Sequence, residues 1–72
     1  MFKSDIKFLN EIQEMVAKQQ YNEDAINKLI NLIVVSQMLA EKEKNNEVVK
    51  LLNYISIVGE ALAEKLYALR NK

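Results

Sequence analysis

The sequence predicts an all-α protein of three helices on two observations. The chain contains no proline and a single glycine, Gly59, so few residues interrupt a helix. Glu, Lys, Leu and Ala, which all favour helix, are abundant, and apolar residues recur at helical spacing. We expect helices at about residues 5–19, 23–44 and 47–70 in one domain, residues 1–72. The two longer helices should form an antiparallel hairpin, with the shorter N-terminal helix packed across it in an oligomeric bundle.

The first predicted helix, residues 5–19, is an ordinary amphipathic one. Ser4 is the expected N-cap, and Asp5 places a negative charge in the first turn, where the helix dipole favours it. The apolar residues occupy one half of a helical wheel, and polar residues fill the other half. The apolar set consists of Ile6, Phe8, Leu9, Ile12, Met15 and Val16.

The second predicted helix, residues 23–44, is apolar on nearly every side. Asn22 is its expected N-cap, and Asn45 with Asn46 should form the turn that follows it. A wheel at 100° per residue gives three apolar stripes. They are Ile26, Leu29, Ile33, Ser36 and Ala40; Ile30, Val34 and Met38; and Leu32, Val35 and Leu39. Two other helices of one chain can cover two stripes, so we expect a second chain to cover the third.

Two short pieces of the chain could be strands on propensity alone. Residues 29–35 and 54–59 are rich in β-branched side chains. Both pieces lie inside longer segments with a helical period, and no turn signals bound them. The sequence therefore favours helix at both places.

The third predicted helix, residues 47–70, combines an apolar stripe with a neighbouring row of small residues. Ser56, Gly59 and Ala63 form the small row, which Tyr67 continues. Small residues at this spacing allow two helices to approach closely, whereas a glycine merely tolerated in a helix costs ~1 kcal/mol. We expect the interface between chains to contain Leu32, Val35, Leu39, Ser56, Gly59, Ala63 and Tyr67.

The composition leaves few routes to catalysis. The chain has no histidine and no cysteine, which removes disulfides, histidine–zinc sites and the common nucleophile–base pairs. Glu60 and Glu64 lie one helical turn apart, but opposite the apolar stripe, where carboxylates are usually solvated. We expect no catalytic, cofactor-binding or metal-binding residues, and therefore no enzyme.

Size and charge indicate how the chain works. A domain of 72 residues buries a marginal core, and oligomerisation is a common remedy when disulfides and metals are absent. Ten basic and ten acidic residues balance, which argues against binding nucleic acid by charge. No apolar run suits a signal peptide or a membrane span, so we expect a cytoplasmic protein.

The predicted function is a small non-enzymatic regulator, inhibitor or adaptor. Its expected partners are a second copy of itself and another protein. Two alternatives remain: a helical dimer that binds nucleic acid, and an oligomer that sequesters a small ligand between subunits.

Overall fold

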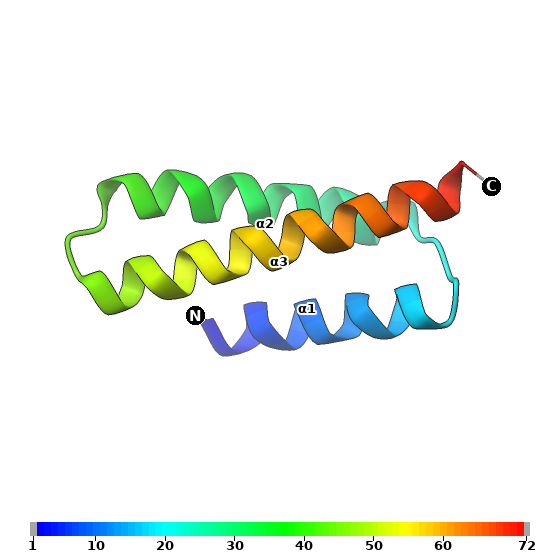
Figure 1. Ribbon diagram of the computed structural model, residues 1–72, viewed down its shortest axis with the longest axis horizontal. Helices are drawn as coiled ribbons and strands as arrows, with labels where there is room; N and C mark the ends of the chain where they lie inside the picture. Colours follow the sequence, from blue (N-terminus) through cyan, green and yellow to red (C-terminus); the bar gives the residue numbers. More distant parts are fainter. Residues whose placement is uncertain (1, 72) are drawn as a thin grey trace.

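The computed structural model describes residues 2–71, in which three helices follow one another: α1 (Phe2–Ala17), α2 (Glu23–Lys42) and α3 (Asn46–Arg70). No strand occurs within these residues, so the all-α prediction is confirmed and the strand alternative is excluded there. α2 and α3 run antiparallel, and α1 lies along them but stops short of the hairpin turn (Figure 1). The molecule is elongated, with extents of 41 × 19 × 16 Å.

Both ends of α1 differ from the prediction. The helix already includes Phe2, so Ser4 lies in its first turn and the N-cap assignment was wrong. The helix ends at Ala17, because Gln19 takes a left-handed conformation with φ 56°. The amide of Gln19 donates to the carbonyl of Val16, and the next amide donates across six residues to Met15. This pair of bonds is a Schellman motif, with glutamine at the position that usually holds glycine.

The N-terminus of α2 is capped as predicted. The Oδ1 atom of Asn22 accepts a hydrogen bond from the Ala25 amide at 3.1 Å, and the backbone of Asn22 is extended. Glu23 and Asp24 place negative charge in the first turn, where the dipole favours it. Local signals therefore defined this helix start correctly.

The connection between α2 and α3 is a three-residue turn, residues 43–45. Glu43 is extended, so α2 ends two residues earlier than predicted. Its carboxylate accepts hydrogen bonds from the amides of Lys44 and Asn45. The side chain of Asn45 then caps α3 by accepting the amides of residues 47 and 48. Polar side chains thus satisfy most of the backbone groups exposed by the turn.

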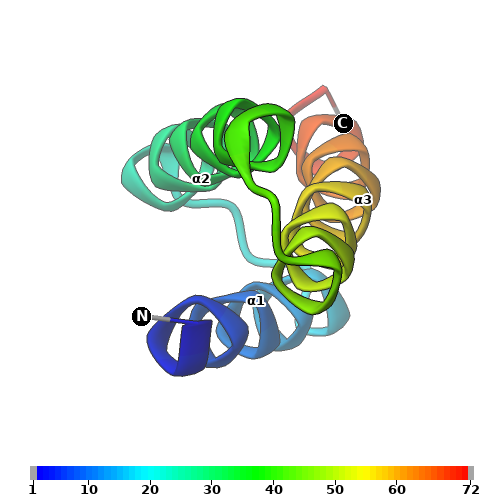
Figure 2. The same cartoon turned by 90° about the vertical axis from the view of Figure 1, so that its left-hand side faces the viewer.

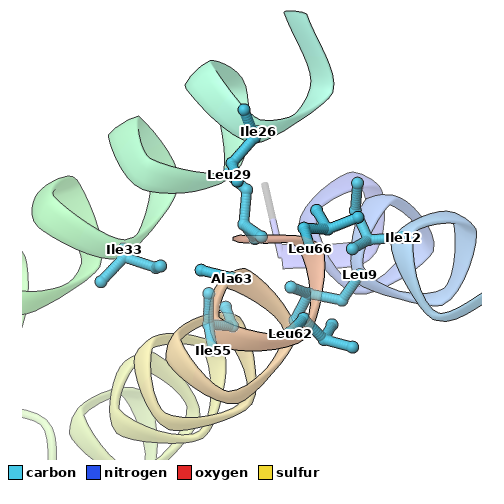
Figure 3. Packing of buried hydrophobic residues seen from close by; sticks show 9 residues of the cluster. All are labelled: Leu9, Ile12, Ile26, Leu29, Ile33, Ile55, Leu62, Ala63 and Leu66. Atoms are coloured by element: carbon cyan, nitrogen blue, oxygen red, sulfur yellow. The ribbon is translucent and has the colours of Figure 1, made fainter. Parts of the chain in front are cut away.

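The core forms where one face of each helix meets the other two. α2 contributes the first predicted stripe, of which Ile26, Leu29 and Ile33 are buried against α3 and α1. α1 contributes Leu9 and Ile12, which Figure 3 shows beside the residues of α3. The buried apolar cluster consists of Leu9, Ile12, Ile26, Leu29, Ile33, Ile55, Leu62, Ala63 and Leu66.

α1 does not cover the other two helices equally. It packs mainly against α3 and makes few contacts with α2. Figure 2, seen from the hairpin turn, shows α1 close to α3 and separated from α2. One contact that joins α1 to α2 is a cation–π interaction, in which the Lys28 ammonium lies 4.6 Å from the centre of the Phe8 ring. The side of α2 that faces away from α3 therefore receives little cover.

Candidate protein interaction surface

Four apolar side chains stand on the surface of the C-terminal half of α2. Val34, Val35, Met38 and Leu39 are 46%, 43%, 53% and 41% exposed. Residues three and four positions apart are neighbours on a helix surface. Val35 is three positions from Met38 and four from Leu39, and Val34 is four from Met38, so the four side chains form one continuous surface. We call this surface the α2 patch. Exposed apolar residues are ordinary when scattered, but contiguous ones mark interaction sites.

The patch continues along α2 as a row with heptad spacing. Leu32, Val35 and Leu39 follow one another at intervals of three and four, and Leu32 is half-buried against the core. The same spacing extends to Lys28 on one side and Lys42 on the other. We call this row of five residues the α2 seam. Its apolar centre and charged ends have the pattern of a helix that packs against another helix.

Two stripes of α2 are exposed at their C-terminal ends, where the sequence predicted that one stripe would lack cover within the chain. Val34 and Met38 belong to the stripe that another helix of the chain was expected to cover, and both are about half exposed. The prediction was wrong because it assumed that α1 would lie across the hairpin. Instead α1 packs on α3, and its N-terminal end does not reach the level of the hairpin turn (Figure 1).

The row of small residues on α3 lies inside the hairpin. Ser56, Gly59 and Ala63 are all buried in the single chain. A Cβ atom built on Gly59 would lie 2.7 Å from Cγ1 of Ile33, closer than any real contact. The close approach read from the sequence is thus confirmed, but it joins α3 to α2 of the same chain. Because these three residues are buried within the chain, they are left out of the interface proposed below.

Tyr67 continues the small row and also lies against the core of its own chain. Its ring is half-buried, and the guanidinium of Arg70 lies 5.0 Å from the ring centre. On the polar side of the hairpin, Nε2 of Gln37 donates to Oε1 of Glu60 at 2.7 Å. The open side of α2 is therefore the one carrying the α2 patch, and the side towards α3 is closed.

The sequence analysis missed a second exposed apolar site, on the outer face of α3. Ile57 is 66% exposed, and Tyr54 beside it is about half exposed. Ile57 lies nearly opposite Leu52 and Ile55 on a helical wheel, and this position could have been read as exposed. Ala61 follows at heptad spacing, but Lys50 and Glu64 hold the next positions in either direction. The site is therefore narrower than the α2 patch.

The electrostatics of the α2 patch are simple, because none of its four residues is charged. A perturbed pKa occurs at the other end of α2, in the linker from α1. There the hydroxyl of Tyr21 donates a hydrogen bond to the carboxylate of Glu23, which raises the pKa of the tyrosine. Arg70, nearby at the end of α3, opposes part of this shift. Titration at this site lies too far along the helix to act on the patch directly.

The part of the chain that the structure describes, residues 2–71, has no enclosed pocket. Within the same residues, no three carboxylate, histidine or cysteine side chains gather in a group that could hold a metal ion. None of the described helices combines the length and apolar character needed to cross a bilayer.

Comparison with known proteins gives no relative from which a function could be transferred. No family model matches the chain, and no curated protein or solved structure is significantly similar to it. The function must therefore be argued from the residues and their arrangement.

Proposed function

We propose that this chain is a small non-enzymatic protein that acts through protein–protein interaction as a homo-oligomer in the cytoplasm. In this role it would serve as a regulator, inhibitor or adaptor. The proposed interface is the α2 patch together with Leu32. The observation that supports the proposal is that four contiguous apolar side chains stay about half exposed in a chain with a small core.

The four exposed side chains of the α2 patch would lose contact with water if a partner covered them. Burying a Val, Leu or Met side chain completely is worth about 1.5–3 kcal/mol. A side chain that is about half exposed therefore still has roughly 1 kcal/mol to gain when a partner covers it. Because the four residues are adjacent, one partner surface can cover them all. The chain also carries no net charge, so two copies meet without overall repulsion.

The total surface supports the same proposal. A compact monomer of 8.3 kDa is expected to expose about 4,600 Å². This chain exposes 5145 Å², which is roughly 550 Å² more than that expectation. The excess is of the same order as the ~800 Å² that each partner contributes to a standard interface.

The experiment is a measurement of mass by light scattering at micromolar concentration. We expect at least twice the chain mass, and a melting temperature that rises with concentration. Val35→Glu and Leu39→Glu should each lower the mass to that of one chain while leaving the helical circular dichroism intact. The physical reason is that an interfacial carboxylate would lose its water and gain no partner.

Two control variants separate association from folding. Asn27→Glu adds the same charge at an exposed position of α2 outside the patch and should leave the mass unchanged. Ile33→Glu, in the buried row, should unfold the subunit. A folded monomer that is insensitive to the Val35 and Leu39 changes at high concentration would overturn the proposal.

A further inference from the structure

We propose that the second copy binds antiparallel, α2 against α2, with a two-fold axis at the level of residue 37 along the helix. This inference rests on the proposed function and adds the direction and register of the pairing. It commits the α2 seam to one occupant, the same seam of another copy of this chain.

The register follows from the heptad spacing of the seam. In antiparallel helix pairs, the two alternating seam positions of one helix pack against the opposite ones of the other helix. Val35 of one copy then meets Leu39 of the second copy, and the symmetric contact repeats the pair. Met38, at the outer edge of the α2 patch, approaches its own equivalent beside the axis. The register thus sets the apolar centre of one seam against the apolar centre of the other.

The lysines at the ends of the seam decide the direction. A parallel pair in register would bring Lys42 against Lys42 of the second copy and align the two helix dipoles, and both effects are repulsive. In the antiparallel register, Lys42 lies over Leu32 of the second copy. Its aliphatic stem can cover the leucine while the ammonium remains in water.

The position of α1 leaves room for this partner. α1 stops short of the hairpin turn and lies close to α3, so the C-terminal half of α2 is open on the side of the seam (Figures 1 and 2). Lys28, at the other end of the seam, is already engaged over the Phe8 ring of its own chain. The partner therefore lies over Leu32, Val35 and Leu39 rather than over the N-terminal half of α2.

The exposed site on α3 is a weaker candidate for the contact between copies. Ile57 and Tyr54 form a narrow row bounded by charged side chains, whereas the α2 patch is two rows wide. The width matters because packing of one helix against another uses side chains from adjacent rows. We therefore place the second copy on α2 and use Ile57 as a control.

The test measures distances between spin labels in the full chain, which has no native cysteine. One variant carries Asn27→Cys and the other Glu41→Cys; both sites are exposed, polar and on the same side of α2. With the axis at residue 37, two labels at position 27 are separated by about 30 Å along the helix axes, and two labels at position 41 by about 12 Å. The label distance should therefore be much longer for Asn27→Cys than for Glu41→Cys.

The outcomes separate the inference from the proposed function. Equal distances at the two positions would show parallel pairing, and a shorter distance at position 27 would place the axis elsewhere; either result overturns the inference alone. Loss of association on Ile57→Glu, with Val35→Glu unaffected, would place the contact on α3 and would overturn both the inference and the interface proposed on α2. A monomeric mass for the labelled and unlabelled chain would overturn the proposed function and the inference together.

Discussion

The α2 patch and the inner row of α2, which is its buried stripe facing α3, consist of the same kinds of residue but differ in burial. Ile26, Leu29 and Ile33 are buried, whereas Val34 and Val35 are nearly half exposed. Ile33 and Val34 are neighbours in the sequence and differ by one methylene. The hydrophobicity of a residue in this helix therefore does not decide its burial. Whether a residue of α2 is buried depends on which neighbouring helices lie against it.

α3 shows the same contrast with the sizes reversed. Gly59 is buried and Ile57, two residues earlier, is the most exposed large apolar side chain of the described residues. The inner position must be small because α2 comes too close for a Cβ atom. The outer position has no such limit. The inner face of α3 therefore carries a small residue where α2 approaches closely, and the outer face of α3 carries larger side chains that remain exposed.

The largest expected effect comes from truncating the inner row. Ile33→Ala should lower the free energy of unfolding by about 2–5 kcal/mol, because the chain cannot fully collapse around the space left. This loss should be the same at every protein concentration when urea unfolding is measured at several concentrations.

Val35→Ala is the change in the α2 patch that corresponds to Ile33→Ala in the inner row. Its effect should grow with protein concentration, since its cost appears only where a second chain covers it. If Val35→Ala lowered the free energy of unfolding strongly at all concentrations, the α2 patch would stabilise the subunit itself. The contrast between the two sides of α2 would then be wrong.

Gly59→Ala tests the close approach of α2 and α3. The new Cβ would force Ile33 to move, and overpacking of this kind costs about 1–3 kcal/mol. Alanine also improves helix propensity by ~1 kcal/mol, so we expect a net loss of up to about 2 kcal/mol in urea unfolding.

Ala61→Gly is the control for helix propensity, because Ala61 is exposed on the same helix. It should cost about 1 kcal/mol through propensity alone. If Gly59→Ala stabilised the protein by the amount that Ala61→Gly destabilises it, no close contact would exist at Gly59.

Gln19→Gly should stabilise the protein. Gln19 adopts a positive φ at the end of α1. In this left-handed conformation a residue with a Cβ atom is destabilised by about 1 kcal/mol, whereas glycine is hardly affected. A gain of about 0.5–1 kcal/mol corresponds to a rise in melting temperature of roughly 2–8 °C in a domain of this size. Gln13→Gly, in the exposed interior of α1, should instead lower the melting temperature. Equal effects of the two changes would contradict the left-handed geometry.

The smallest effect concerns pH. The pKa of Tyr21 is raised in the folded chain, so between its unfolded and folded pKa values the folded state holds the proton that the unfolded state has lost. The contribution is fully present below the unfolded pKa of about 10 and is lost as pH rises through the folded pKa. Tyr21→Phe should therefore flatten the fall in unfolding free energy above pH 10. Tyr54→Phe removes an exposed tyrosine elsewhere in the chain. If the hydrogen bond from Tyr21 to Glu23 causes the fall in unfolding free energy, this second change should leave that fall as it is.

Of the proposed interaction surface, the sequence could indicate the centre. Val35 and Leu39 lie exposed on α2, on the stripe that the helical wheel left without cover. Val34 and Met38 could not be assigned in the same way, because their exposure depends on where α1 packs. A wheel counts apolar faces, but it does not show how many of them the neighbouring helices reach.

Local patterns were enough to predict three helices, the cap at Asn22 and the apolar stripes of α2, since these features depend on residues within a few positions of one another. The packing of α1 on α3, the contact of Gly59 with Ile33 and the exposure of two stripes at the C-terminal half of α2 depend instead on how the helices are arranged in space. The physical reason is that burial of apolar surface is non-directional. An apolar stripe gains the same free energy from its own chain as from another, so only the positions of the helices decide which of them covers it.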